Sequence, residues 1–535
     1  MKFIFYSIIA LVHSALLAQQ ITPLWQLREA TNGSIDAYTP LVLVDSFHNI
    51  ITCGSTYTPG PATGFVTFKY NQDGDKLWER RHQTSATDFI TAAATDREGA
   101  VYVGGVTINN PLGGTGNQVI FKYSAEGDTL WEYYLKVDQG ISSSITNLLL
   151  DENDNLLIFG AYFDIIEQKG GLFVQKKSPE GTMLWTATHV ETNYSYGASN
   201  ARYVGDHWVF WGRNSSSAAG GTRLLCWQIG LDGQTLDAAA SGLNPEIIYP
   251  LHLDAEGNLF LTRGAEYKVV KYNITATKEW EYTKPSMVLP QGQLYALTTD
   301  EHLNIYSIGH VRIDSAHVDA LNTKLNNSGE VLWEHHLSFT NFPFNLSADR
   351  LVWLKQNLLL TAGNISVNPD SNFSKCFFAV YNSDGFLQGG LPEILGRKNR
   401  ITSITPDGNF FYTTGQLGPE NYLIDTTKLF LHKYALQDLV STTNPIKGMI
   451  GQMSVWPNPA SGQCSILLDN NTDARSGILQ ICNAQGIVVY RAVIPLPYGS
   501  QAIEIESFAR FPAGIYQTSI LTEARMYSAK MLKGR

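Results

Sequence analysis

The sequence predicts an all-β chain in which four-stranded units repeat around a closed ring. Three observations lead to this prediction: a strand–turn–strand unit that recurs, a second such unit that alternates with it, and an even spacing of tryptophans. Long stretches of helical periodicity are absent, whereas Tyr (26), Phe (24) and Gly (46) are plentiful among the 535 residues. This composition favours many short strands joined by turns.

The first repeated unit is an apolar strand, a tight polar turn with glycine, and a second strand that opens on Leu-Trp. Its clearest copies run over residues 66–79 and 119–132. Further copies occupy residues 172–185, 224–236, 267–280 and 321–333, and a weaker one occupies 377–387. An eighth copy, residues 429–434, has the first strand but no convincing second strand.

The second repeated unit is a strand pair joined by a turn that contains Asp with Gly or Asn. Clear copies run over residues 95–104, 253–261 and 405–411. Related copies surround Asp45, Asp151, Asp206, Asp300 and Gln356. Asp supplies local hydrogen bonds in such turns, and Gly or Asn tolerates positive φ there.

Together the two units place four strands in each period. The tryptophans at positions 25, 78, 131 and 185 are spaced by 53, 53 and 54 residues. Four strands in about 40–50 residues are typical of a propeller blade. Trp25 lies in a Leu-Trp strand that precedes every other unit, so this strand can complete the last blade. We therefore predict an eight-bladed β-propeller with four-stranded blades, closed by the N-terminal strand. Seven blades remain an alternative if one weak copy is degenerate.

The repeated positions have structural interpretations. A large aromatic at the same place in each blade is expected to fill the gap between neighbouring blades. The Asp turns could be calcium loops, but calcium needs six to eight oxygens at one point, and a single Asp in a short turn does not supply them. The densest candidate, residues 151–155, is also interpreted as a turn. We assign no metal site and no cofactor.

The N-terminus and the overall composition indicate an exported chain. Residues 1–18 have the lysine, apolar run and small residues of a signal peptide. No later segment is long and apolar enough for a stable membrane span. A net charge of −10 argues against nucleic-acid binding. Cys53, Cys226 and Cys376 are expected to be buried free thiols. Cys464 and Cys482 could pair, which the sequence leaves open.

Residues 24–435 resemble the SBBP-type propeller repeat of bacterial secreted proteins. The matching parts are the Asp-x-x-Gly strand pair and the Lys-Tyr/Leu-x-x-x-Gly-x-x-x-Trp pair. This resemblance implies a propeller and secretion, and it implies no particular activity.

Residues 453–535 resemble the type IX secretion C-terminal sorting domain of Bacteroidetes. The matching motifs are a Pro-Asn-Pro opening, an Asn-x-x-Gly turn, a Gly-x-Tyr strand and a terminal basic segment. The residues that carry them are Pro457, Asn458, Pro459, Gly486, Gly514, Tyr516 and Lys530. The resemblance implies export across the outer membrane and recognition by the type IX machinery. We expect a small C-terminal β-sandwich, preceded by a linker over 441–452 and by the propeller over 19–440.

No motif of known enzymatic chemistry is present. The chain has no His-Glu-x-x-His, no Gly-x-Ser-x-Gly and no phosphate-binding glycine loop. We therefore assign no catalytic residue and favour a protein that is not an enzyme. One sequence cannot show whether two acidic residues form a glycosidase pair or whether a Ser-His-Asp triad assembles in the fold.

Function is expected from the long loops, which should lie on the face of the ring opposite the short repeated turns. Loops on a rigid scaffold concentrate binding residues, and aromatic side chains in them can contact sugars or proteins. The candidate ligand-binding residues are Tyr194, Tyr196, Tyr249, Phe342 and Tyr422. Our hypothesis is an exported binding or scaffold protein for an extracellular glycan or protein. The alternatives are a hydrolase or lyase with its site at the channel mouth, and a spacer without a ligand.

Overall fold

A computed structural model describes the chain in segments that together cover most of both predicted units. The described residues are 23–29, 41–57, 63–83, 87–108, 116–135, 141–164, 166–192, 195–216, 221–243, 248–263, 266–284, 292–312, 318–339, 345–354, 358–366, 374–383, 387–393, 400–417, 428–436, 450–451, 453–458, 464–470, 476–483, 488–496, 499–505, 509–521 and 526–534. The predicted signal peptide, residues 1–18, lies outside them. Within them, no helix is long and apolar enough to cross a bilayer.

Seven sheets of the ring are each built from four consecutive antiparallel strands. The first is β2 (Leu41–Val44), β3 (Ile50–Tyr57), β4 (Thr63–Tyr70) and β5 (Lys76–Gln83). The second is β6 (Thr87–Thr95), β7 (Val101–Ile108), β8 (Gly116–Tyr123) and β9 (Thr129–Leu135). The third is β10 (Ile141–Leu150), β11 (Leu156–Asp164), β12 (Lys169–Lys177) and β13 (Met183–Thr192). The fourth is β14 (Ser195–Val204), β15 (His207–Ser216), β16 (Gly221–Gly230) and β17 (Thr235–Ala240).

The remaining three consecutive sheets have the same order. The fifth is β18 (Ile248–Leu253), β19 (Leu259–Arg263), β20 (Tyr267–Tyr272) and β21 (Lys278–Lys284). The sixth is β22 (Gly292–Thr299), β23 (Ile305–Arg312), β24 (Val318–Leu325) and β25 (Val331–Phe339). The seventh is β26 (Asn345–Leu354), β27 (Leu358–Ser366), β28 (Ser374–Asn382) and β29 (Leu387–Glu393). These sheets resemble the blades of a propeller.

An eighth four-stranded sheet joins the two ends of the repeat region. It consists of β30 (Arg400–Asp407), β31 (Phe410–Leu417), β32 (Lys428–Ala435) and the N-terminal strand β1 (Trp25–Glu29). Strand β1 runs antiparallel to β32, with Trp25 opposite Lys433. The prediction that the N-terminal strand completes the last copy of the repeat is therefore confirmed.

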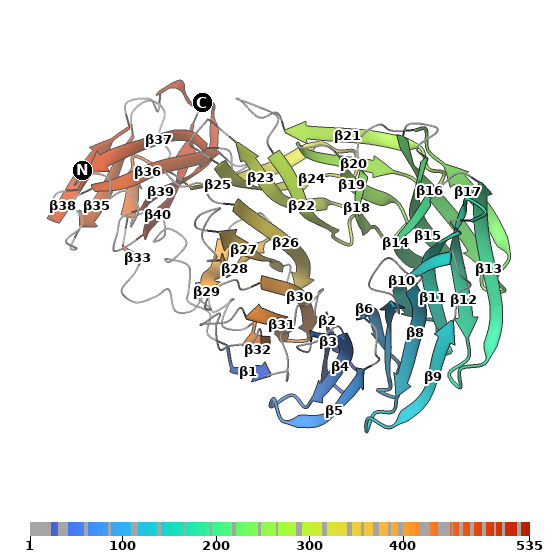
Figure 1. Cartoon of the computed structure of the whole chain (residues 1–535). Helices are drawn as coiled ribbons and strands as arrows, with labels where there is room; N and C mark the ends of the chain where they lie inside the picture. The colour runs from blue at the N-terminus through green and yellow to red at the C-terminus, as the bar shows by residue number, and fades with distance from the viewer. Residues whose placement is uncertain are drawn as a thin grey trace, which may run out of the picture.

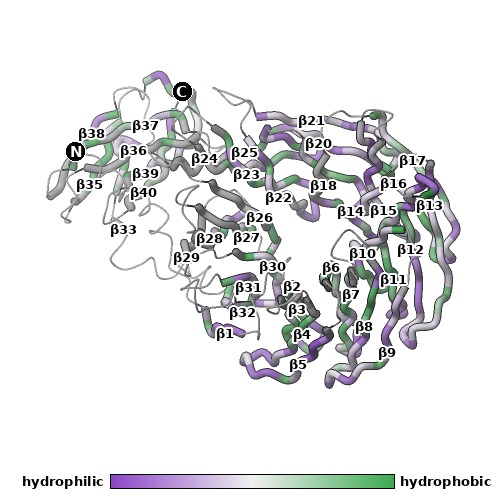
Figure 2. Tube along the Cα trace, in the orientation of Figure 1, coloured by the Kyte–Doolittle hydropathy of each residue, from purple (hydrophilic) through white to green (hydrophobic). Residues whose placement is uncertain are grey.

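Apolar cores lie between successive sheets rather than in one centre. One cluster joins Val66 and Phe68 of the first sheet to Tyr412 and Leu431 of the eighth, so the two ends of the repeat pack against each other. Similar clusters join each of the other neighbouring pairs. Figure 1 shows the sheets following one another around a ring. In Figure 2 the hydrophobic stretches follow middle strands such as β8 and β11, while the outer strands β5 and β13 are mostly hydrophilic.

The tryptophans of the Leu-Trp strands bind the neighbouring sheet by hydrogen bonds as well as by packing. The indole Nε1 of Trp78 donates to the carbonyl oxygen of Ala125 at 2.9 Å, and that of Trp131 donates to Pro179 at 2.9 Å. Trp25, Trp185, Trp280 and Trp333 make the equivalent bond to the next sheet around the ring. The expectation that these side chains fill the gaps between blades is confirmed.

A lysine stands opposite each of these six tryptophans on the neighbouring strand of the same sheet. In several sheets the lysine donates to the same carbonyl as the tryptophan. Lys122 lies 3.0 Å from the oxygen of Pro179, and Lys433 lies 2.8 Å from the oxygen of Gln72, which also accepts from Trp25. In these sheets, two donors on one carbonyl oxygen hold the sheet to the next one around the ring.

The fourth sheet departs from this pattern. Gln228 and Asp237 occupy the positions of the lysine and the tryptophan. Gln228 still donates to the next sheet, with its Nε2 at 3.2 Å from the carbonyl oxygen of Ile274. A tryptophan on a different strand, Trp211, donates to the carbonyl oxygen of Gly257 at 2.9 Å. The contact between the fourth and fifth sheets is therefore made by other residues.

The C-terminal unit consists of two further sheets packed around their own core. One has the order β33-β40-β39-β36-β37 and the other β34-β35-β38. Their bounds are β33 (Ile450–Gly451), β34 (Met453–Trp456), β35 (Ser465–Asn470), β36 (Ser476–Asn483), β37 (Val488–Pro495), β38 (Gly499–Glu504), β39 (Gly514–Leu521) and β40 (Met526–Lys533). Strand β33 falls within the segment predicted as a linker and pairs in parallel with β40.

The cysteines that the structure describes are buried thiols. Cys53, Cys226 and Cys464 are free, and burial raises the pKa of the Cys464 thiol to about 11. The sulfur of Cys464 lies 3.3 Å from that of Met531 inside the C-terminal core. The disulfide between Cys464 and Cys482 that the sequence left open is therefore not formed. The side chains of Cys376 and Cys482 lie outside the described part of the structure.

Candidate functional site

The repeated Asp turns lie on one face of the ring and are held by internal hydrogen bonds. One oxygen of Asp151 accepts from the backbone amides of Asn153 and Asn155, and the other accepts from the Asn155 side chain at 2.9 Å. The ammonium of Lys176 lies 2.8 Å from the same carboxylate. The first and second sheets have the equivalent pairs Lys69–Asp45 and Lys122–Asp96.

These contacts support the interpretation of the Asp motifs as turns rather than calcium loops. A buried ammonium and several amide donors already occupy the carboxylate oxygens that a cation would need. Burial acts to raise the pKa of Asp151, but the bonds from Lys176 and Asn155 outweigh it and leave this pKa below its usual value. Among the residues that the structure describes, no three His, Cys, Asp or Glu side chains gather as metal ligands.

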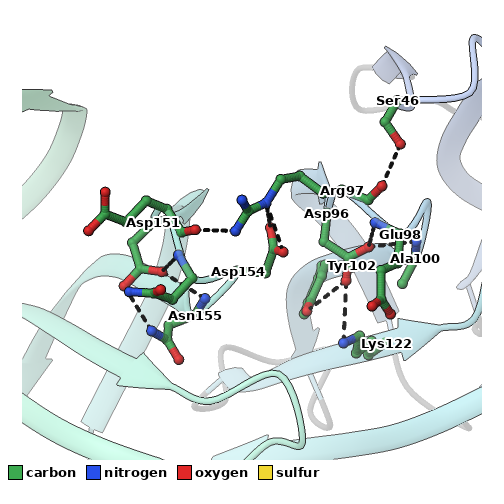
Figure 3. A network of polar contacts seen from close by, with 12 residues as sticks. Ser46, Asp96, Arg97, Glu98, Ala100, Tyr102, Lys122, Asp151, Asp154 and Asn155 are labelled. Atoms are coloured by element: carbon green, nitrogen blue, oxygen red, sulfur yellow. Dashed lines mark hydrogen bonds and ion pairs between the residues drawn. The ribbon is translucent and has the colours of Figure 1, made fainter.

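A hollow of about 440 Å³ lies on this turn face between the first three sheets. Its polar groups contact one another (Figure 3). Arg97 spans the hollow: its Nε lies 3.1 Å from a carboxylate oxygen of Asp154, and its Nη2 donates to the carbonyl oxygen of Glu152. The hydroxyl of Ser46 donates to the carbonyl oxygen of Arg97 at 2.7 Å. The arginine thus links three turns, which is a structural role.

A second polar cluster lies at the opposite ends of the strands, away from the repeated Asp turns. It joins the third and fourth sheets through Glu191 of β13, Tyr196 of β14, Asn214 of β15 and Arg223 of β16. One oxygen of Glu191 accepts from the side-chain amide of Asn214 at 2.9 Å and from Arg223. Arg223 Nε also donates to Asn214 Oδ1 at 3.0 Å. We call these four residues the Glu191 cluster.

The electrostatics of the Glu191 cluster favour an ionised carboxylate. Burial would raise the pKa of Glu191, but the hydrogen bond from Tyr196 and the positive charge of Arg223 outweigh it, and this pKa is lowered. Burial, followed by the hydrogen bond to Glu191, raises the pKa of Tyr196, so its hydroxyl stays protonated. The other oxygen of Glu191 lies 3.5 Å from Nε2 of His189.

The cluster offers hydrogen-bond donors and acceptors beside aromatic rings. Glu191 and Arg223 are partly exposed, while Asn214 is buried and holds them in place. The ring of His189 lies beside those of Tyr196 and Trp227, at centroid distances of 6.3 and 6.1 Å. The described residues bring one carboxylate to this cluster, whereas glycoside hydrolysis commonly uses two.

The structure brings one of the five predicted ligand-binding residues into this cluster. Tyr196 is half-buried, and its hydroxyl lies 3.1 Å from the side-chain amide of Asn214. Tyr249 lies in β18, but its side chain is outside the described part of the structure. Tyr194, Phe342 and Tyr422 are also outside it. Sequence reasoning missed Glu191, Asn214 and Arg223 as a group, because they lie on three different strands and no spacing connects them.

The C-terminal unit positions several residues of the predicted sorting motifs. The side chain of Asn458 accepts a hydrogen bond from the backbone amide of Leu532 at 2.8 Å. The buried Tyr516 donates through its hydroxyl to the carbonyl oxygen of Pro512 at 2.7 Å. Lys530 stands opposite Gln517 in the β39–β40 pair. Pro459 and Gly486 lie outside the described residues.

Comparison with known structures gave distant matches. The chain is similar to the WD40 domain of SCAP from fission yeast, with 8% identity over 79% of this chain and 98% of that chain, at a TM-score of 0.44. It is also similar to an α-L-arabinanase of Penicillium chrysogenum complexed with arabinobiose, with 10% identity over 54% and 94% of the two chains, at a TM-score of 0.35. A protein of unknown function from Bacteroides caccae matches with 12% identity over 51% and 89%, at a TM-score of 0.27. The blade-like architecture itself follows from the strand order and register described above.

Comparison with known sequences identifies the C-terminal unit. No curated protein matches the chain. Residues 454–533 match the family described as the secretion system C-terminal sorting domain. This range covers almost all of the segment in which the sorting motifs were predicted. The chain therefore carries a type IX secretion sorting domain, and the protein is secreted or displayed on the cell surface.

Proposed function

We propose that this protein is an exported eight-bladed propeller that binds an extracellular glycan through the face carrying the long loops. In this proposal a signal peptide, residues 1–18, directs the chain across the inner membrane, and the sorting domain directs it across the outer membrane. The propeller, residues 19–440, remains outside as a rigid scaffold, with residues 441–452 as its linker. The repeat is proposed to be of the SBBP type.

The eight-blade count is supported by the eight four-stranded sheets of the described residues and by the packing of the eighth sheet on the first. Eight blades give a ring in which all inner strands face a common axis. The short repeated turns then form one face, where the charged groups of the hollow contact one another. In this proposal the ligand binds to the opposite face.

The observation that carries the binding proposal is the Glu191 cluster. It holds an ionised carboxylate and a guanidinium together, beside the rings of Tyr196 and His189, at the long-loop ends of four strands. Sugar hydroxyls both donate and accept hydrogen bonds, and sugar rings pack on aromatic faces. Tyr194, Tyr249, Phe342 and Tyr422 are proposed to extend this surface from the neighbouring loops. A protein ligand, a hydrolase or lyase activity, and a spacer role are the competing outcomes.

The test is a screen of the whole mature chain on an array of extracellular polysaccharides and cell-surface proteins. Arg223→Gln removes the positive charge of the Glu191 cluster, and the glutamine side chain can still form hydrogen bonds. Arg97→Gln is the matched control, because Arg97 forms a comparable ion pair with Asp154 on the turn face. Circular dichroism establishes that both variants are folded. The same array is assayed for released sugars or cleaved products.

We expect saturable binding to a polysaccharide that Arg223→Gln weakens by about tenfold, equivalent to about 1.4 kcal/mol, and that Arg97→Gln leaves unchanged. Binding to proteins alone would replace the glycan by a protein ligand. Release of sugars would favour the hydrolase or lyase. A folded protein that binds nothing on the array, or binds equally in both variants, would contradict the proposal.

A further inference from the structure

Among the described residues of the C-terminal unit, three exposed large apolar side chains lie within or next to the Pro-Asn-Pro, Gly-x-Tyr and terminal basic segments. Trp456 is 68% exposed, Ile515 is 57% exposed and Leu532 is 41% exposed. Trp456 directly precedes the Pro-Asn-Pro segment, and Ile515 is the middle residue of the Gly-x-Tyr motif. Leu532 lies in the terminal basic segment. All three therefore belong to segments that identify the sorting domain.

Backbone contacts bring the segments that carry these three side chains close together. Ile515 and Leu532 are direct partners in the antiparallel pair of β39 and β40, so their side chains lie next to each other on one face. Asn458, two residues after Trp456, accepts a hydrogen bond from the backbone amide of Leu532 at 2.8 Å. We call Trp456, Ile515 and Leu532 the sorting patch.

The core of the unit does not need the sorting patch. Alternate residues of the same strands, among them Val455, Tyr516 and Met531, already fill the interior. Tyr516 is fixed by its bond to Pro512, and Lys533 by a bond of 2.7 Å from its ammonium to the carbonyl oxygen of Ala509. The motif residues Asn458 and Tyr516 thus act as supports, and the side chains beside them are turned outward.

We propose that the sorting patch is the surface by which the type IX secretion machinery recognises this domain. The family match assigns residues 454–533 to a domain whose role is recognition by a secretion system, so its partner is already specified. Exposed apolar clusters in a soluble domain mark interaction surfaces. Apolar and aromatic residues, with Trp foremost, contribute most to the binding free energy of such surfaces. The partner is therefore an apolar surface of the export machinery.

The test measures export of the full chain in a bacterium that has the type IX system. The variant carries Trp456→Ser, Ile515→Ser and Leu532→Ser. The control is Val489→Ser, since Val489 is also exposed, at 37%, but lies on β37, which is separated from β40 by β39 and β36. Export is the fraction of the chain degraded by protease added to intact cells. The folded state of retained chains is measured by circular dichroism after purification from the periplasm.

We expect at least a tenfold loss of export for the triple variant, with folded protein retained in the periplasm, and wild-type export for Val489→Ser. Ile515→Lys, a single change at an exposed position, is expected to give the same loss if the triple variant is not folded. Wild-type export of either folded variant would overturn the proposal. A change in oligomeric mass with unchanged export would also overturn it, because the patch would then bind a second copy of the chain. The retained chain should still bind the glycan, which separates this proposal from the proposed function.

Discussion

The indole ring of Trp78 lies against Gly127 of the next sheet, so closely that a Cβ at position 127 would come within 2.7 Å of the ring. Gly127 has a φ of +93°, a conformation that other residues rarely adopt. The same pairing joins Trp25 to Gly74, Trp131 to Gly181, Trp185 to Gly233 and Trp280 to Gly329. The Gly and Trp of one repeat unit thus contact the neighbouring units rather than each other.

Gly127→Ala is expected to destabilise the ring by about 2–4 kcal/mol, because left-handed strain and a steric clash with Trp78 add together. Gly205→Ala is the matched control. Gly205 also has positive φ, +62°, but a Cβ there would meet nothing within 4 Å. The control should lose only about 1–2 kcal/mol. Urea denaturation of both variants measures the difference, and equal losses would show that the indole contact is unimportant.

Trp131 and Lys122 should be coupled, because both donate to the carbonyl oxygen of Pro179, at 2.9 and 3.0 Å. After Trp131→Phe alone or Lys122→Met alone, one hydrogen-bond donor to this carbonyl oxygen remains. The double variant leaves it none, so its loss should exceed the sum of the single losses by about 0.5–3 kcal/mol. A double-mutant cycle on the free energy of unfolding measures this coupling. Strictly additive losses would mean that the two donors act independently.

Trp25→Ala should weaken the closure of the ring. Trp25 donates to the carbonyl oxygen of Gln72 at 2.9 Å and covers Gly74, and truncating a packed tryptophan costs about 3–5 kcal/mol. The adjacent Leu24 is exposed, so Leu24→Ala should change stability little. The two variants are compared by denaturation and by hydrodynamic radius. If the denaturation midpoint of Trp25→Ala equals that of the wild type, the ring is not closed by the N-terminal strand.

His252 should make stability depend on pH. Burial, and secondly the charge of Arg202, lower the pKa of this side chain from 6.5 to about 4. Between these values the unfolded chain binds a proton that the folded chain does not, so stability is full above pH 6.5 and falls as the pH falls towards 4. The loss is about 3 kcal/mol, at about 1.4 kcal/mol per pKa unit.

The check for His252 is unfolding measured from pH 7 to pH 4 in the wild type and in His252→Gln. Glutamine can keep the hydrogen bond to Thr299, which the histidine makes at 3.0 Å, but it does not titrate. The wild type should lose about 3 kcal/mol more than the variant over this range. Parallel pH profiles would show that His252 does not titrate with a lowered pKa.

The strand pairs of the ring could be predicted because each local pattern has one structural solution. Asp-x-x-Gly turns and Leu-Trp strands recur at nearly fixed spacing. Trp25 lies in a Leu-Trp strand that precedes every other repeat unit, so this strand has no neighbouring strand in sequence to pair with. Other features carried no sequence signal. The register shift between Lys122 and Tyr123 recurs beside the lysine of most sheets, but a bulge depends on the twist of the finished sheet.

The candidate site was less predictable than the fold. Tyr196 was selected because it is an aromatic residue in a loop-rich region, whereas its hydroxyl is held by Asn214, which is 18 residues further along the chain. Glu191 and Arg223 are 32 residues apart and meet only because the third and fourth sheets pack together. The fourth sheet also lacks the Lys-Trp pair, and no local pattern predicts that Gln228 and Trp211 make its contacts instead.

The central claim is that the ring lies outside the cell, where the proposed glycan ligand is found. The most direct measurement is protease digestion of intact cells that express either the full chain or residues 1–449, in a bacterium with the type IX system. The account predicts that the ring of the full chain is accessible to protease, while the truncated chain stays protected in the periplasm. A truncated chain that reaches the surface as efficiently as the full chain would contradict the role of the sorting domain.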